Sequence, residues 1–151
     1  MIEGGRAARL FGTDGIRGVA NRDLTPELVL RVGRALVATL GRDRIYLVGR
    51  DTRLSGPMLE AAIGAGICAG GGDVERAGIL PTPAVAFLTR SLGRPGGIVL
   101  SASHNPIEDN GVKLFGPDGF KFPDEVEDRI EAVLGKNDPG PVGAEVGRVR
   151  D

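Results

Sequence analysis

The chain has 151 residues, a formal net charge of −1 and a single cysteine, Cys68. This length suits one domain with a substantial core. One cysteine excludes a disulfide scaffold, and the near-zero charge argues against non-specific nucleic-acid binding. The apolar runs are too short for a membrane span, and the first residues lack the apolar stretch of a signal peptide. We therefore expect a cytoplasmic protein with neither a membrane nor a nucleic acid as its partner.

Helix-like and strand-like segments alternate along the chain. Apolar residues at helical spacing follow Pro26, with Thr25 placed as the N-cap and Gly41 at the C-terminus. The strands are expected at residues 45–48, 74–79, 98–100 and 112–115. Further helices are expected around residues 59–67, 85–92 and 126–134. Ser55 is well placed to cap the second helix, and Asp124 with Glu127 resembles a capping box that opens the last one.

This alternation predicts βαβ units in an α/β fold. We expect three α/β/α layers around a mainly parallel, mixed sheet of about four strands. In such sheets ligands bind beyond the carboxyl ends of the strands, so the loops 49–53, 80–83 and 101–106 should share one rim. Residues 1–9 are expected to be a leader, 10–135 the domain, and 136–151 a linker to a second domain.

The loop that follows the strand at 98–100 carries the most reactive side chains. It contains Ser101, Ser103, the only histidine (His104) and an Asn105-Pro106 step, which disfavours helical geometry before the proline and predicts a tight, exposed bend at Ser103. A serine is a poor nucleophile without assistance, and His104 and Lys113 are the available helpers. The alternative is a polar turn whose side chains satisfy their own backbone. The loop does not match the Gly-x-Ser-x-Gly elbow of hydrolases.

Two further clusters are rich in glycine or arginine. Residues 11–18, Phe-Gly-Thr-Asp-Gly-Ile-Arg-Gly, fit neither a dinucleotide fingerprint nor a Walker loop, and they could be a plain hairpin with Arg17 as a surface charge. Residues 49–57 place Asp51 between Arg50 and Arg53. This pattern indicates ion pairs that either hold a loop or contact phosphate, and structural pairing is the favoured interpretation. Arginine outnumbers lysine by 16 to 3, which suits phosphate binding, although a GC-rich genome would give the same excess.

Taken together, these segments resemble the first domain of the alpha-D-phosphohexomutase superfamily, and within it the bacterial phosphoglucosamine mutases. The Ser-Ala-Ser-His-Asn-Pro stretch at 101–106 resembles the active-site serine loop, and Asp-Asn-Gly-Val-Lys at 109–113 resembles the segment after it. Residues 11–18 resemble the amino-terminal signature of the glucosamine branch, and residues 49–56 resemble a further family segment. The resemblance covers residues 10 to 150, and the four segments occur in the family's order.

The resemblance implies a reversible isomerase that interconverts the 6-phosphate and 1-phosphate of glucosamine. Ser103 would be the phosphoserine, and a bisphosphorylated sugar, which also serves as activator, would be the intermediate. Lys113 would be the general acid/base, while Arg17 and His104, with Asn105 beside them, would bind the phosphate. Mg2+ would bind an oxygen of the Ser103 phosphate. Phosphoryl transfer depends mainly on positioning and on positive charge, which agrees with these roles.

The chain resembles only the first of the family's four domains. The Asp-Gly-Asp-x-Asp magnesium loop and the Glu-x-Ser-Gly-His sugar loop are missing from this sequence. We therefore expect the remaining domains as partners and no activity from this fragment alone. Two alternatives stay open: the same domain of a phosphoglucomutase or phosphomannomutase, and a non-catalytic phosphosugar-binding module.

Overall fold

Strands and helices alternate in the computed structural model, which describes residues 9–136 and 138–151. The α-helices are α1 (Pro26–Leu40), α2 (Gly56–Gly70), α3 (Thr82–Ser91) and α4 (Asp124–Val133). The strands are β1 (Ile16–Val19), β2 (Ile45–Arg50), β3 (Asp73–Ile79), β4 (Gly97–Leu100), β5 (Asp109–Phe115) and β6 (Val149–Arg150). A short 3₁₀ helix, η1 (Gly143–Glu145), precedes β6.

The strands form one mixed sheet in the order β1-β5-β4-β2-β3-β6. β2 is parallel to β3 and β4, β6 is parallel to β3, and β5 is antiparallel to both β1 and β4. The mainly parallel sheet is confirmed, but the described residues form six strands instead of about four. The sequence prediction missed β1 and β6, which are short and gain their hydrogen bonds from partners far away in the chain.

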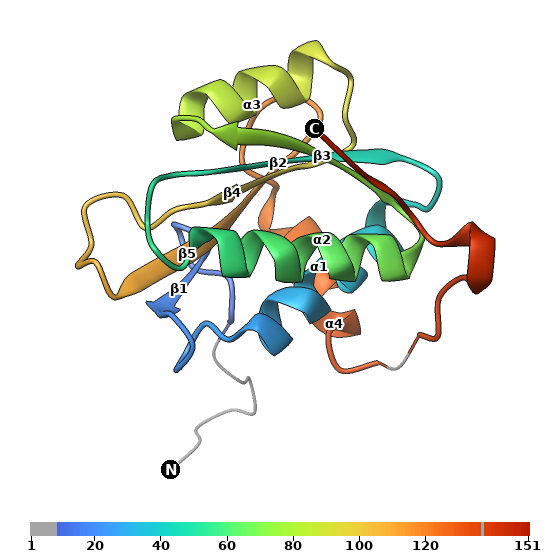
Figure 1. Cartoon of the computed structure of the whole chain (residues 1–151), viewed down its shortest axis with the longest axis horizontal. Helices are drawn as coiled ribbons and strands as arrows, with labels where there is room; N and C mark the ends of the chain where they lie inside the picture. Colours follow the sequence, from blue (N-terminus) through green and yellow to red (C-terminus); the bar gives the residue numbers. More distant parts are fainter. Residues whose placement is uncertain (1–8, 137) are drawn as a thin grey trace.

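The sheet is the middle of three layers, with α1, α2 and α4 on one face and α3 on the other (Figure 1). Side chains alternate along β4, so that Ile98 and Leu100 join the larger core beneath α1 and α2, whereas Val99 joins the smaller core beneath α3. Burial on both faces explains the continuous apolar runs in the sequence.

Two glycines allow α1 and α2 to pack closely. A Cβ atom on Gly33 would lie 2.7 Å from the carbonyl oxygen of Ile63, and one on Gly66 would collide with the carbonyl of Leu30. Glycine is therefore needed where the two backbones meet. Among the residues that the structure describes, neither these helices nor any other has the length and apolar character of a membrane span.

The helix ends confirm some of the predicted caps and correct others. Thr25 Oγ1 accepts the N–H of Leu28 at 3.2 Å, and Gly41 ends α1 with φ 123°. Ser55 precedes α2 but makes no capping bond: its backbone is helical, with φ −76° and ψ −7°, where an N-cap is normally extended, and its hydroxyl accepts from Asn110 at 2.8 Å. The capping box of Asp124 is also wrong: Pro123 holds the N-cap position without a side-chain bond.

Glu127, which was expected to form the capping box with Asp124, makes other contacts. Glu127 is buried, and one of its oxygens accepts a charged hydrogen bond from Lys121 at 2.8 Å. Arg9 approaches the same oxygen at 3.6 Å, and it also pairs with Asp128 at 3.0 Å. Glu127 therefore ties neighbouring segments to α4 instead of closing the first turn of that helix.

The expected leader and linker lie partly on described residues. Residues 1–8 and 137 lie outside the described part, whereas Arg9 contacts α4 as given above. Within the expected linker, Val149 pairs with Val74 at the edge of the sheet, and Pro141 lies against Gly71. Domain limits at residues 10 and 135 stay a prediction.

Candidate active site

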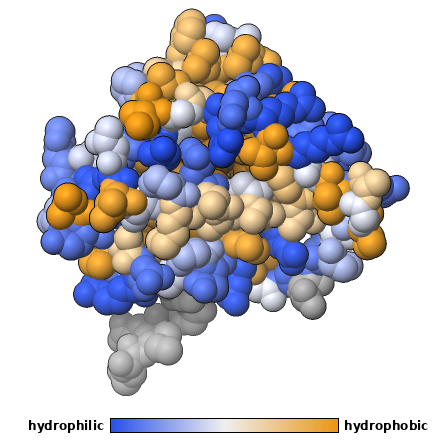
Figure 2. All heavy atoms as spheres, viewed as in Figure 1, coloured by the Kyte–Doolittle hydropathy of each residue, from blue (hydrophilic) through white to orange (hydrophobic). Residues whose placement is uncertain are grey.

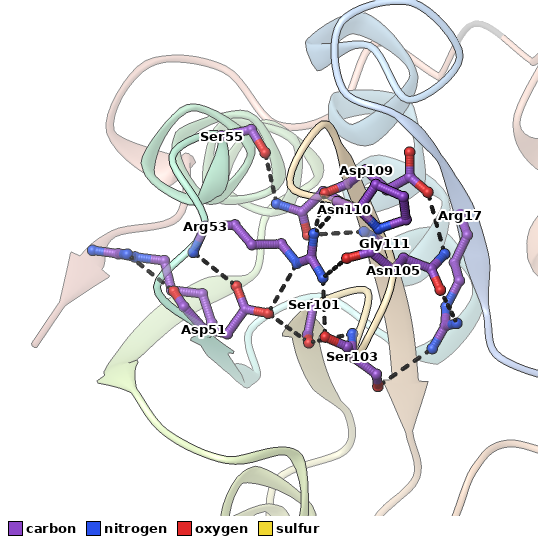
Figure 3. A network of polar contacts seen from close by, with 12 residues as sticks. Arg17, Asp51, Arg53, Ser55, Ser101, Ser103, Asn105, Asp109, Asn110 and Gly111 are labelled. Carbon is purple, nitrogen blue, oxygen red and sulfur yellow. Dashed lines mark hydrogen bonds and ion pairs between the residues drawn. The ribbon is translucent and has the colours of Figure 1, made fainter.

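The loops that follow β2, β3 and β4 meet beyond the carboxyl ends of these strands, as their parallel arrangement requires. The N–H of Asp51 donates to the carbonyl of Leu100 at 3.1 Å, and the N–H of Leu80 donates to the carbonyl of Arg50 at 3.0 Å. The predicted common rim is therefore confirmed. The serine loop, defined here as residues 101–109, rises from this rim between β4 and β5 (Figure 3).

Ser103 lies exposed on a tight bend of the serine loop. Its φ of 52° is in the left-handed region, which non-glycine residues rarely adopt. The bend is held by a backbone bond from Asn105 to the carbonyl of Ala102 at 3.0 Å and by Ser101 Oγ, which accepts the N–H of Ser103 at 3.1 Å. Ser101 Oγ also donates to Asp51 at 2.7 Å. Ser101 is thus committed to the loop, while the hydroxyl of Ser103 stays accessible.

Arg17 reaches Ser103 from β1. Its Nη2 donates to Ser103 Oγ at 3.4 Å and its Nη1 to Asn105 Oδ1 at 3.5 Å, both long for such bonds. Its buried Nε has no partner among the described residues. The side chain crosses β5 at Gly111, where a Cβ would lie 3.1 Å from Arg17 Cγ and 2.5 Å from the carbonyl of Ser101. Arg17 therefore has spare donor capacity directly beside the Ser103 hydroxyl.

The arginines at the end of β2 and just after it form structural ion pairs, and the one between Arg53 and Asp51 is of the kind that the sequence favoured. Arg53 Nε pairs with Asp51 at 3.3 Å, and Arg50 Nε pairs with Glu60 at 3.3 Å. The Arg53 guanidinium also extends across to the serine loop, where it donates to backbone carbonyls, including that of Ser103 at 3.0 Å (Figure 3).

His104 and Lys113 are not joined to Ser103 by hydrogen bonds. His104 is exposed, and its backbone makes no hydrogen bond to another backbone group of the described residues. Lys113 is half-buried in β5, with Nζ 5.6 Å from the centre of the Phe115 ring. Arg17 pairs with Gly111, two residues before Lys113, so Arg17 and Lys113 are diagonal neighbours on one face of the sheet. The structure thus joins Ser103, Arg17 and Asn105, and places Lys113 one diagonal step away.

One buried contact and one exposed contact fix the surroundings of this site. Asn110 is fully buried, donates to Ser55 Oγ at 2.8 Å and accepts the N–H of Gly111 at 2.8 Å, which ties the start of α2 to β5. At the end of β1, Asp23 pairs with Arg22 at 2.9 Å and accepts the N–H of Val19 at 3.0 Å. These two contacts lower the pKa of Asp23, so it keeps its charge while it closes the turn.

The described residues do not make a metal site by themselves. Among residues 9–136 and 138–151, no three His, Cys, Asp or Glu side chains lie together in a way that could hold a metal ion. Mg2+ requires a nearly octahedral set of oxygen ligands. Ser103 could contribute one phosphate oxygen to such a set, but the rest would have to come from elsewhere.

Residues 8–140 match the family model described as phosphoglucomutase/phosphomannomutase, alpha/beta/alpha domain I. The chain belongs to the phosphoglucomutase/phosphomannomutase family. The three layers, with the sheet in the middle, and the exposed serine at the rim are therefore features of a family member's first domain.

Relatives of this family domain extend well beyond its length. A phosphoglucosamine mutase of Moorella thermoacetica is 58% identical over 149 residues, covering 95% of this chain and 34% of the relative. One of Desulforamulus reducens is 54% identical over 148 residues, covering 94% of this chain and 33% of the relative. A crystal structure of a phosphoglucomutase/phosphomannomutase family protein from Burkholderia thailandensis has a TM-score of 0.74 and 29% identity, covering 94% of this chain and 32% of that one. The chain thus spans about a third of the length of the curated relatives it matches.

The structure brings together three of the residues that the sequence singles out, Ser103, Arg17 and Asn105, but the sequence analysis missed how the serine loop is held. Asp51 and Arg53 were interpreted as a pair within their own loop, whereas both also bind the serine loop. A usable signal was present: the two residues directly follow one buried strand, and Ser101 directly follows another. Neighbouring parallel strands bring such positions together.

Proposed function

We propose that this chain is the phosphoserine-bearing domain of a phosphoglucosamine mutase, which interconverts glucosamine 6-phosphate and glucosamine 1-phosphate. The observation that carries the proposal is the exposed hydroxyl of Ser103, held on a left-handed bend with Arg17 at 3.4 Å. Relatives with that activity in their names are 54% and 58% identical over most of the chain, which favours glucosamine over glucose or mannose. The accessible serine beside an arginine with spare donors also favours catalysis over a module that only binds phosphosugars.

The proposed reaction begins with Ser103 phosphorylated. A sugar hydroxyl attacks the phosphorus, the bond from phosphorus to Ser103 Oγ breaks, and a bisphosphorylated sugar forms. Lys113, as general acid/base, takes the proton of the attacking hydroxyl. The sugar then turns over, and its other phosphate returns to Ser103 with the opposite proton movement. Arg17 stabilises the charge on the transferring group, as positioned donors do in phosphoryl transfer.

His104 and Asn105 complete the proposed phosphate-binding set. His104 is exposed next to Ser103 and is free to turn toward a phosphate. Asn105 holds Arg17 on one side and donates to Asp109 at 3.3 Å on the other, which aligns Arg17 with the serine. A bisphosphorylated hexosamine or hexose would recharge a Ser103 that has lost its phosphate.

The remaining partners are proposed to come from a longer protein. Mg2+ would take one oxygen from the Ser103 phosphate and its other ligands from domains that this chain does not include. Leu54 and Ile107 are large apolar side chains that are 90% and 74% exposed beside the rim. Hydrophobic groups are scattered among hydrophilic ones over the face drawn in Figure 2. Exposed apolar groups beside a site are suited to contact with another domain.

The direct test is phosphorylation of Ser103 in the full-length protein. Incubation with a labelled bisphosphorylated hexose should place one phosphate on Ser103, detected by peptide mass spectrometry, and Ser103→Ala should abolish both labelling and turnover. Ser91 is an exposed serine at the end of α3, so Ser91→Ala is the matched control and should keep both the label on Ser103 and the turnover. The 151-residue chain alone should fold without converting glucosamine 6-phosphate. Labelling at another residue, or full turnover by Ser103→Ala, would refute the proposal.

A further inference from the structure

Arg53 binds the backbone of the serine loop at several carbonyl groups (Figure 3). Its Nη1 donates to the carbonyls of Pro106 at 2.7 Å and Asp109 at 2.9 Å. Its Nη2 donates to those of Ser103 and Asn105, both at 3.0 Å. One side chain thus gathers carbonyls from most of the length of the loop.

A carboxylate completes the set of partners of Arg53. Nε donates to Asp51 Oδ2 at 3.3 Å, while Asp51 Oδ1 accepts the backbone N–H of Arg53 at 3.0 Å. The Arg53 side chain is only 10% exposed. These bonds use every N–H group that a guanidinium offers, so Arg53 has no donor left for a phosphate.

The same ion pair controls both peptide groups that flank Ser103. The N–H of Ser103 is held by Ser101 Oγ, which in turn donates to Asp51 at 2.7 Å. The carbonyl of Ser103 is held by Arg53 at 3.0 Å. Fixing both peptide planes fixes the φ of Ser103 at 52°, a conformation that costs a non-glycine residue free energy and needs support from its surroundings.

We propose that Arg53 is a positioning residue for phosphoryl transfer, which sets the direction of the Ser103 hydroxyl without contacting substrate. This inference rests on the proposed function. A trans peptide directs its C=O and its N–H to opposite sides, so the hold on the Ser103 carbonyl also turns the N–H of His104 away from Arg53. That N–H has no acceptor among the described residues, which leaves it available to a phosphate on Ser103.

The first test is kinetic and uses the full-length enzyme. Arg53→Ala should lower kcat about 10²-fold, the cost of a small misplacement of a reacting group, and should leave KM within about threefold because no substrate contact is lost. Ethylguanidinium in the buffer should restore at least a tenth of the lost turnover, whereas ethylammonium should restore none, since only a planar fork can bind paired carbonyls. Equal rescue by both cations, or a normal kcat, would overturn the proposal.

Two further variants serve as the matched control and as the safeguard against misfolding. Arg94 pairs with Glu75 at 2.9 Å and is 20% exposed. It precedes β4, whereas Ser103 follows β4, so the two residues lie at opposite ends of that strand. Arg94→Ala should therefore keep the wild-type kcat. If Arg53→Ala fails to fold, Arg53→Lys is used in the same kinetic test. Lysine keeps the aliphatic part of the side chain and the charge beside Asp51 but lacks the planar guanidinium. A wild-type kcat for Arg53→Lys would equally refute the positioning role.

The second test does not depend on the proposed function. Amide hydrogen exchange of the 151-residue chain should speed up about tenfold or more in the serine loop of Arg53→Ala, with β2 and β4 unchanged. Unchanged exchange in the loop would overturn the inference. If Ser103→Ala retains activity, the proposed function fails, while the exchange experiment still decides whether Arg53 holds the loop.

Discussion

The two arginines that reach the serine loop differ in how many of their donors are used. Arg53, after β2, spends every N–H on Asp51 and on loop carbonyls, with bonds to the loop of 2.7 to 3.0 Å. Arg17, in β1, makes two long bonds of 3.4 and 3.5 Å and keeps a buried Nε without a described partner. On the Arg53 side of the loop every guanidinium donor is therefore used, which we call the saturated side. On the Arg17 side donors remain unused, which we call the unsaturated side.

This difference separates the arginine that holds the serine loop from the arginine that can bind a phosphate. A saturated guanidinium cannot accept a new anion without giving up bonds that fix the loop. An unsaturated one gains partners when a phosphate arrives, because charged hydrogen bonds to phosphate are stronger than its present long ones. We therefore expect the chemistry on the Arg17 side, where Lys113 also lies, and rigidity on the Arg53 side.

The largest effect is expected from Lys113→Met in the full-length enzyme. General acid/base assistance contributes about 10²–10⁴-fold in rate, so kcat should fall by that range, with KM nearly unchanged. Steady-state kinetics at saturating bisphosphorylated activator measure both quantities. Lys136 is an exposed lysine, and Lys136→Met is the control that should leave both unchanged. Near-normal turnover in Lys113→Met would take proton transfer away from this residue and favour His104.

A smaller loss is expected from Arg17→Ala, about 10²–10³-fold in kcat, which is typical of removing one donor to a developing charge. The sharper experiment compares lysine replacements at the two arginines. Arg17→Lys should retain part of the activity because an ammonium still neutralises phosphate, whereas Arg53→Lys should behave like Arg53→Ala. Equal losses in the two lysine variants would show that the saturated and unsaturated sides are not functionally different.

The sequence predicted the helices and the central strands because these segments bury continuous apolar stripes. It missed β1, where Arg17-Gly18 interrupts a short run and the pairing partner, β5, lies far along the chain: Ile16 pairs with Val112, 96 residues away. It missed β6 for a similar reason, since Val149 is exposed and gains only edge pairing with β3. Elements that depend on distant partners leave little local signal.

The same limit applied to the site. The exposed bend at Ser103 was predictable, because the Asn105-Pro106 step and the end of a buried strand are local features. The contacts of Arg53 with the loop could not be predicted, because the sequence does not tell which loop carbonyls turn toward the end of β2. Ser55 shows the opposite error: its local pattern indicated a helix cap, but its backbone is helical and its hydroxyl instead binds Asn110, 55 residues away.

The smallest effect is expected at Tyr46, which reports whether the variants above disturb only the rim. Tyr46 lies near the start of β2, and its buried hydroxyl donates to the carbonyl of Gly41 at 2.6 Å, while β2 ends at Arg50 beside the serine loop. Burial raises the pKa of Tyr46 from 10.0 to about 12. Since the folded pKa lies above the unfolded one, the stability linked to this group is fully present below pH 10 and is lost as the pH rises toward 12.

This chain contains one tyrosine and no tryptophan, so phenolate absorbance reports Tyr46 alone. The midpoint should stay near 12 in the wild type and in the Arg17→Ala and Arg53→Ala variants, and should drop to about 10 in urea. A midpoint that falls only in Arg53→Ala would mean that the Arg53 contacts stabilise the whole length of β2. The kinetic loss in that variant would then reflect a weakened scaffold, and the contrast between the two arginines would lose its meaning.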